Sequence, residues 1–281
     1  MPPSAQPTDT RALPMPDTVH TVVFSDFDET YLAHASTPDQ VSSRAALEDW
    51  LEHASRRHGL LFGWVTGSSL DSVLRKSDTH ALRVLPHFMA CSLGTELYAV
   101  DETGPRLAAE WQHSLPDAAY IRGHATRAVQ ELGALGVPLR PQLNRGPESR
   151  VISHYYRTRG PEQDAQNLAL IRRTARRFSL GVYLSRCNPL TGDPDDCYDV
   201  DFLPGNCGKS QVVDYICRRY GVDPAKSFAF GDSGNDLDML TAVGHGVLVG
   251  NCTEEARSLH PRVSTKSYAD AILFELQEVL Q

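Results

Sequence analysis

Short apolar runs alternate with amphipathic stretches along the first part of this chain. Residues 22–24 and 60–65 are short and almost entirely apolar, which predicts buried strands of a parallel sheet. Residues 43–59 between them repeat apolar side chains at helical spacing, so we expect a helix there. Its buried face would carry Leu47, Trp50, Leu51 and Ala54, with Ser43 capping the start and Gly59 closing the end.

The same alternation continues to about residue 112. Residues 69–77 predict a helix after the loop TGSS, and residues 87–100 predict a pair of strands with a turn at Gly94. Strands that alternate with helices in this way are typical of a doubly wound α/β sheet. The fold class that we expect is therefore α/β, with a doubly wound, mostly parallel, Rossmann-like core.

A separate α+β unit is predicted over residues 113–203, where the rhythm changes. Its pattern favours helices over 121–136 and 164–178 and strands over 150–157, 181–186 and 198–203. The alternation of strands and helices then resumes. It predicts helices over 209–221, 235–244 and 268–280 and strands over 227–232 and 245–251, and the helix over 235–244 is short. We therefore expect a core made of residues 20–112 and 204–281, with an inserted cap at 113–203.

Charge and composition narrow the classes of partner. The formal net charge of −8 makes nucleic acid a poor candidate, because domains that bind polyanions are usually basic. No apolar run approaches the roughly 18 to 20 residues that cross a bilayer, so we expect no membrane partner. Residues 1–19 lack the order of a secretory signal and are rich in proline and small polar residues, which predicts a flexible tail on a cytoplasmic protein. The sequence leaves the oligomeric state open.

Six cysteines are present, and four of them recur every ten residues from Cys187 to Cys217. Their spacing matches no zinc pattern, since no CxxC or HxxxH pair occurs. We therefore expect reduced, partly buried thiols rather than a metal or disulfide array.

Polar clusters occur at four places where a predicted strand ends or a helix begins. They are DFDET from Asp26 to Thr30, TGSS from Thr66 to Ser69, Lys209 after PGNCG, and GDSGND from Gly231 to Asp236. In an open α/β sheet, ligands bind beyond the carboxyl ends of the strands. Each cluster alone is common as a turn or a helix cap, but we expect the four together to form one site.

The chemistry that this set suits is phosphoryl transfer. Carboxylates from two loops can hold Mg²⁺, a hard cation that prefers oxygen ligands, and the cation lets Asp26 approach a phosphate as a nucleophile. Asp28 can protonate the leaving oxygen and later activate water. The helix start at Thr66 offers N–H groups to an anion, and Lys209 adds a compact positive charge.

These residues resemble the four motifs of the haloacid dehalogenase superfamily, over nearly the whole chain from Val22 onward. The resemblance implies that Asp26 forms an aspartyl-phosphate and that Asp28 is the acid and base. It further implies a Mg²⁺ ion bound by the Asp26 and Asp232 carboxylates and the Asp28 carbonyl. The remaining motif residues would hold the phosphoryl group or support the metal ligands: Thr66, Gly67, Ser68, Lys209, Asn235 and Asp236.

Finer details resemble the sucrose-phosphatase-like branch of that superfamily, which hydrolyses sugar phosphates. The segments SLGTELYAVDETG and YDVDFLPGNCGKSQ carry this likeness, and the branch places an α/β cap between its second and third motifs. One departure is Glu29, which stands where the first motif commonly has glycine and adds a third carboxylate near the site. We expect its side chain to point away from the phosphate.

The substrate that this branch implies is a hexose 6-phosphate or an amino-hexose 6-phosphate, for example kanosamine 6-phosphate in antibiotic biosynthesis. Arg150, His154 and Asn188 are the cap residues that we expect to bind the sugar. Sucrose phosphate or another sugar phosphate remains open as the substrate. A phosphomutase, a dehalogenase and a non-enzymatic module that accepts phosphate on Asp26 also remain open as functions.

Overall fold

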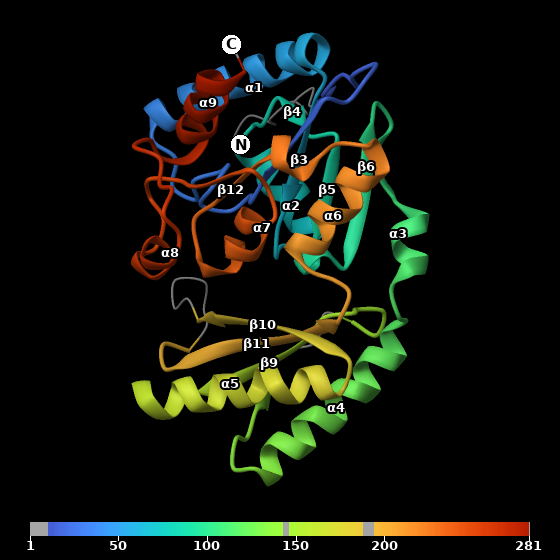
Figure 1. Cartoon of the computed structure of the whole chain (residues 1–281), viewed down its shortest axis with the longest axis vertical. Helices are drawn as coiled ribbons and strands as arrows, with labels where there is room; N and C mark the ends of the chain where they lie inside the picture. The colour runs from blue at the N-terminus through green and yellow to red at the C-terminus, as the bar shows by residue number, and fades with distance from the viewer. Residues whose placement is uncertain (1–10, 143–145, 188–193, 281) are drawn as a thin grey trace, which may run out of the picture. The chain divides into compact units, whose positions relative to one another are not determined.

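A computed structural model describes residues 11–142, 146–187 and 194–280, and it divides the chain into two compact units. The core unit comprises residues 1–109 and 209–281, and the inserted unit comprises residues 110–208. These limits make the inserted unit slightly wider than the range of 113–203 expected from the sequence. Figure 1 shows the elements of both units. Among the described residues, none of the helices combines the length and the apolar character needed to cross a membrane.

The described part of the core unit contains a seven-stranded sheet in the order β13-β12-β2-β3-β5-β6-β7. Its strands are β13 (His245–Leu248), β12 (Phe228–Gly231), β2 (Thr21–Ser25), β3 (Leu60–Val65), β5 (Phe88–Cys91), β6 (Glu96–Asp101) and β7 (Gly104–Leu107). The pairs from β13 to β5 are parallel, and β6 and β7 continue the sheet antiparallel. The expected mostly parallel α/β fold is confirmed.

Helices cover both faces of this sheet (Figure 1). They are α1 (Pro38–His58), α2 (Leu70–Thr79), α6 (Lys209–Tyr220), α7 (Leu237–Thr241), α8 (Glu254–Leu259) and α9 (Tyr268–Val279), with 3₁₀ turns η1 (Ser92–Gly94), η3 (Pro224–Lys226) and η4 (Gly234–Asp236). The helices α1 and α9 lie side by side and share one buried cluster with strand residues such as Val23 and Phe62. Gly246 and Val247 are neighbours in β13, so they point to opposite faces of the sheet. Val247 belongs to the buried cluster of α1 and α9, here called the α1/α9 cluster, whereas Gly246 lies against the backbone of Leu240 in α7. The helix α7 therefore covers the other face.

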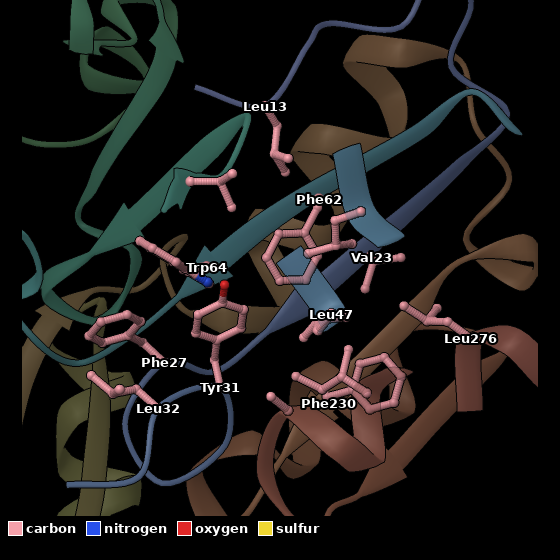
Figure 2. Close-up of a cluster of buried hydrophobic side chains, with 14 of the residues drawn as sticks. Leu13, Val23, Phe27, Tyr31, Leu32, Leu47, Phe62, Trp64, Phe230 and Leu276 are labelled. Carbon is pink, nitrogen blue, oxygen red and sulfur yellow. The ribbon is translucent and has the colours of Figure 1, made fainter. Parts of the chain in front are cut away.

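Large aromatic side chains in that cluster hold the loop after β2 against the sheet (Figure 2). Phe27, which separates Asp26 from Asp28, is fully buried with its ring centroid 4.7 Å from that of Trp64. Tyr31 lies 5.1 Å from the same indole and is also buried. Burial of each such ring contributes about 1.5–3 kcal/mol, so the loop that carries the two aspartates is anchored by the core.

Two predictions about the core unit were wrong in detail. The helix α1 begins at Pro38, where Thr37 and Gln40 form a capping box, and not at Ser43. Its first turn is polar and exposed, so hydrophobic periodicity did not reveal it. The end at Gly59 is confirmed by its left-handed φ of 60°.

The expected flexible tail also differs from the structure after residue 10. Arg11–Ala12 (β1) pairs in parallel with Val84–Leu85 (β4), and Leu13 is buried in the α1/α9 cluster. The carbonyl oxygen of Pro14 lies 3.1 Å from Nε2 of the buried His87. These partners are distant along the chain, so the polar composition of the segment did not indicate them.

The inserted unit is a four-stranded antiparallel sheet with helices on one face, as far as its residues are described (Figure 1). Its strand order is β10-β11-β9-β8. The elements are α3 (Ala109–Ser114), α4 (Ala118–Ala134), β8 (Arg140–Pro141), β9 (Ile152–Arg157), α5 (Pro161–Arg177), β10 (Leu180–Arg186) and β11 (Cys197–Pro204). Side chains of α4 and α5 pack against one face of the sheet in a separate core. All six cysteines of the chain are buried, and none of them forms a disulfide in the described part of the chain.

Candidate active site

The order of the strands brings the carboxyl ends of β12, β2 and β3 next to each other. Asp232 follows β12, Asp26 follows β2 and Thr66 follows β3. Because parallel neighbours end at the same edge of a sheet, these three residues meet there. Lys209, the first residue of α6, reaches the same place.

Asp26 is held tightly at the centre of this group. Its backbone N–H donates to the carbonyl of Phe230 at 2.9 Å, and its Oδ1 accepts the N–H of Phe27 at 2.7 Å. Lys209 Nζ lies 3.1 Å from the same Oδ1. Burial raises the pKa of Asp26 well above its ordinary value, with the Lys209 ammonium opposing this and the neighbouring carboxylates adding to it.

Asp232 and Asp236 complete a cluster of three carboxylates with Asp26. One ligand oxygen from each lies within 4.8 Å of the others. Burial, followed by the charge of Asp236, raises the pKa of Asp232 to about 7, although a hydrogen bond from the Thr30 hydroxyl (2.8 Å) opposes the shift. The ammonium of Lys209 lies 3.1 Å from Asp26 Oδ1 and 2.6 Å from Asp236 Oδ1.

Asp236 makes the hydrogen bonds that hold this cluster in place. Its Oδ2 accepts the backbone N–H groups of Asp232 (3.0 Å) and Ser233 (3.1 Å), and its Oδ1 accepts Lys209 Nζ at 2.6 Å. The side chain is completely buried. Lys209 also donates to Asn235 Oδ1 at 3.3 Å, so the GDSGND loop and the start of α6 are tied together.

The donor set fits a hard divalent cation. It consists of carboxylate oxygens, two of which belong to groups whose pKa values are raised by burial and by mutual repulsion. A bound dication would remove that repulsion and favour the ionised forms. Mg²⁺ has these ligand preferences, so the residues present are compatible with the expected metal.

Asp28 lies outside the three-carboxylate cluster and has its own partners. Its Oδ2 accepts the Ser68 hydroxyl at 2.8 Å, and its Oδ1 accepts Lys76 Nζ and lies 2.9 Å from His34 Nε2. Burial by itself would raise the pKa of Asp28, but Lys76, His34 and Ser68 together lower it from its ordinary value. Lys76 and His34 were not predicted from the sequence. The sequence feature that could have indicated Lys76 is its position in α2 next to Ser77, which lies on the buried face of that helix.

The TGSS loop after β3 is held by hydrogen bonds within the loop and by hydrogen bonds to β5 and η1. Thr66 is buried, donates its N–H to the carbonyl of Ala90 (2.8 Å) and accepts the N–H of Ser68 on Oγ1 (3.0 Å). The backbone of Leu93 donates to the Thr66 carbonyl at 3.1 Å. A side chain at Gly67 would come within 3.3 Å of Leu93, so the absence of a Cβ at this position relieves the packing.

Glu29 turns toward partners other than the three acids. Its Oε1 accepts the backbone N–H of His34 at 2.9 Å, and its Oε2 accepts the Tyr268 hydroxyl at 3.2 Å. Its φ is 58°, in the left-handed region that favours glycine, which gives a physical reason for the glycine that the first motif commonly has. The amide of Asn251 donates to the Glu29 carbonyl at 2.7 Å and holds this turn.

The cap residues named from the sequence have other surroundings in the structure. Arg150 donates to the carbonyl of Pro116 (2.7 Å) and to the Gln112 side chain, so it joins segments of the inserted unit. His154 pairs across the sheet with Val200 and lies against Phe202, on the face that α4 and α5 cover. Neither placement supports a sugar contact. Asn188 lies outside the described residues.

The face of that sheet opposite α4 and α5 carries different polar residues, of which Ser153 and Asp201 are buried. Strand alternation places Ser153 and Tyr155 of β9 opposite Asp201 and Asp199 of β11, away from the helices. The Gln142 amide donates to Asp199 Oδ1 at 2.7 Å. The period-two pattern of residues 152–157 contained this information, because Ile152 and Tyr156 mark the buried side.

Comparison with known proteins assigns this chain to a family. The model of the sucrose-6F-phosphate phosphohydrolase family matches residues 19–276. The chain belongs to this family.

Individual relatives agree with this assignment. Kanosamine-6-phosphate phosphatase from Bacillus subtilis is 35% identical over 261 residues, which cover 92% of each chain. The crystal structure of a haloacid dehalogenase-like hydrolase from Bacillus subtilis superposes with a TM-score of 0.77 at 34% identity, covering 97% of this chain and 96% of that one. The sucrose-phosphatase from Synechocystis shares the fold, with a TM-score of 0.68 at 20% identity over 93% of this chain and 98% of its own.

Membership of the sucrose-6F-phosphate phosphohydrolase family confirms the resemblance to haloacid dehalogenase phosphatases. The chain is an enzyme, a phosphomonoester hydrolase of the sugar phosphatase class. The non-enzymatic module considered from the sequence is therefore set aside.

Proposed function

We propose that the enzyme hydrolyses a hexose or amino-hexose 6-phosphate with Mg²⁺, through an aspartyl-phosphate on Asp26. The observation that carries this proposal is the convergence of three carboxylates, of which Asp26 and Asp236 are buried, with the Lys209 ammonium at one edge of the sheet. Such a group is costly in an apolar setting unless a cation and an anionic substrate complete it.

In the first half of the reaction, a carboxylate oxygen of Asp26 attacks phosphorus and the bond from phosphorus to the sugar oxygen breaks. In its protonated form, Asp28 gives its proton to that oxygen, so the sugar leaves as an alcohol. The lowered pKa of Asp28 limits the fraction of the enzyme that carries this proton. In the second half, Asp28 takes a proton from water, whose oxygen attacks phosphorus and releases inorganic phosphate. Asp26 is then a free carboxylate again.

The other motif residues take supporting roles in this proposal. Lys209, with Thr66, Gly67 and Ser68, would bind the phosphoryl oxygens through an ammonium, hydroxyls and backbone N–H groups. Mg²⁺ would be held by the Asp26 and Asp232 carboxylates and the Asp28 carbonyl, supported by Asn235 and Asp236. When bound, the cation would screen these acids from the phosphate.

The amino-hexose form of the substrate has its own support. The relative from Bacillus subtilis is named for kanosamine 6-phosphate, the phosphate of an amino sugar. In the inserted unit, the face of the sheet opposite α4 and α5 carries Asp199 and Asp201, whose carboxylates suit an ammonium group. A role in antibiotic biosynthesis is part of this form of the proposal. We propose that the inserted unit selects the sugar.

Purified protein tests the proposal when free phosphate is measured over a panel of sugar phosphates, with Mg²⁺ and with EDTA. We expect phosphate release that needs the cation and favours a hexose or amino-hexose 6-phosphate over sucrose phosphate. Asp26→Asn should abolish turnover and acid-stable labelling of the protein by the substrate phosphoryl group. Asp214→Asn, an exposed carboxylate on α6, is the matched control. Near wild-type turnover by Asp26→Asn would show that the nucleophile is assigned wrongly.

The phosphomutase alternative is separated by one further measurement. A mutase returns the phosphoryl group to sugar, so a labelled sugar bisphosphate would pass its label to a sugar monophosphate. A phosphatase passes the label to inorganic phosphate. Activity that survives EDTA would instead favour the dehalogenase chemistry that needs no cation.

A further inference from the structure

The carboxylate of Asp28 is contacted by side chains from three different segments. Lys76 of α2 and His34 of the loop after β2 both contact Oδ1, and Ser68 of the loop after β3 donates to Oδ2. The Asp28 side chain is 23% exposed and that of Lys76 is 29% exposed. This ion pair is therefore partly shielded from water, and it is stronger than a fully exposed one.

His34 is itself fixed on its second side. Its Nδ1 lies 3.1 Å from Glu29 Oε1, and its backbone N–H donates to the same oxygen at 2.9 Å. Glu29 is held in turn by the hydroxyl of Tyr268 at 3.2 Å. A continuous chain of polar contacts therefore runs from α9 through Glu29 and His34 to Asp28, which leaves the imidazole little freedom to turn.

We propose that Lys76 and His34 are positioning residues, which hold the Asp28 carboxylate in the orientation that acid–base catalysis needs. This inference rests on the proposed function, in which Asp28 serves the leaving oxygen. A general acid works only within hydrogen-bond distance of the atom it protonates. The side chain of Asp28 has two rotatable bonds and interacts electrostatically with Asp26, so without Lys76 and His34 it would turn toward solvent.

Substitution of Lys76 by methionine tests this inference, because methionine keeps most of the side-chain length and removes the charge. The measured quantity is kcat/KM for the preferred sugar phosphate and for p-nitrophenyl phosphate, both at saturating Mg²⁺. A sugar alkoxide needs a proton to leave, whereas p-nitrophenolate leaves without one. We expect kcat/KM for the sugar phosphate to fall by at least about tenfold, within the range that general acid–base catalysis supplies, and for p-nitrophenyl phosphate to fall several-fold less.

Matched variants separate positioning from general damage. The quantity to compare is the ratio of kcat/KM for the sugar phosphate to kcat/KM for p-nitrophenyl phosphate, which Lys76→Met should lower. Lys76→Arg should restore part of this ratio, and His34→Gln should lower it as Lys76→Met does. Lys266→Met removes a surface lysine that pairs with Asp270 at 3.4 Å and should leave the ratio unchanged. If Lys76→Met does not fold, His34→Gln carries the same test, because the His34 side chain is 46% exposed.

The outcomes are distinguishable from failure of the proposed function. A wild-type protein that releases no phosphate from either substrate overturns the proposed function, and this inference with it. An active wild type whose Lys76→Met and His34→Gln variants lose both activities equally, or keep or gain activity, overturns this inference alone. A gain in particular would mean that these side chains restrain Asp28 in a resting state.

Discussion

Replacement of Gly231 by alanine should damage both the stability of this enzyme and its proposed metal site. Gly231 is the last residue of β12 and the first of GDSGND. A Cβ at this position would lie 2.2 Å from Cβ, 2.4 Å from Cγ and 2.6 Å from Oδ2 of Asp236. Folded proteins do not tolerate such contacts, so the buried Asp236 must move.

The magnitude follows from the partners of Asp236. Overpacking of a well-filled interior costs about 1–3 kcal/mol, and the displaced carboxylate would leave the N–H groups of residues 232 and 233 unsatisfied, at about 1–3 kcal/mol more. We expect the free energy of unfolding of the core unit to fall by about 3 kcal/mol. That lowers its melting temperature by roughly 5–10 °C. Asp232 loses its backbone anchor, so half-saturation by Mg²⁺ should require a higher concentration.

Gly234 in the same motif is the control. A Cβ at Gly234 meets nothing closer than Glu255 Oε1 at 4.0 Å, so Gly234→Ala should change stability by no more than about 0.5 kcal/mol. Thermal unfolding and Mg²⁺-dependent phosphate release, measured on both variants, give the comparison. The reasoning is refuted if Gly231→Ala matches Gly234→Ala in melting temperature and in Mg²⁺ dependence.

Other predictions concern the helix cap, the cation and the inserted unit. Thr37→Ala should cost about 1 kcal/mol in urea unfolding and leave activity intact, whereas Ser43→Ala should cost little; equal effects would contradict the observed start of α1. Because the pKa of Asp232 is raised to about 7, protons compete with Mg²⁺ below that pH, so the half-saturating Mg²⁺ concentration should fall as pH rises from 6 to 8. The same shift means that the folded state binds more protons than the unfolded state between the ordinary pKa of 3.8 and about 7. Metal-free stability should therefore decline as pH rises through that window, and a flat profile would argue against the shift. Arg150→Ala should destabilise the inserted unit without changing KM for the sugar phosphate; a raised KM with unchanged stability would restore the sugar-binding role expected from the sequence.

Local pattern was enough to predict most of the architecture. A short apolar run such as residues 60–65 and an amphipathic repeat such as residues 209–221 report burial through their own side chains, so the corresponding strand and helix were predicted correctly. The order of these elements, with the rule that parallel strands end at one edge, then predicted that Asp26, Thr66 and Asp232 would meet. The convergence of Asp26 and Asp232 with Lys209 followed from topology rather than from side-chain detail.

Tertiary structure alone decided which side chains touch. Lys76 reaches Asp28 because α2 packs beside the loop after β2, and no spacing along the chain encodes that approach. His34 lies in the same loop as Asp28 and reaches it through the turn of that loop. The pairing of residues 11 and 12 with β4 is another contact between distant segments. The place of His154 is a different case, because the alternation of Ile152 and Tyr156 along β9 already marked the face that α4 and α5 cover. Burial periodicity is a property of neighbouring residues, whereas partners across space are set by register and packing, and these exist only once the chain has folded.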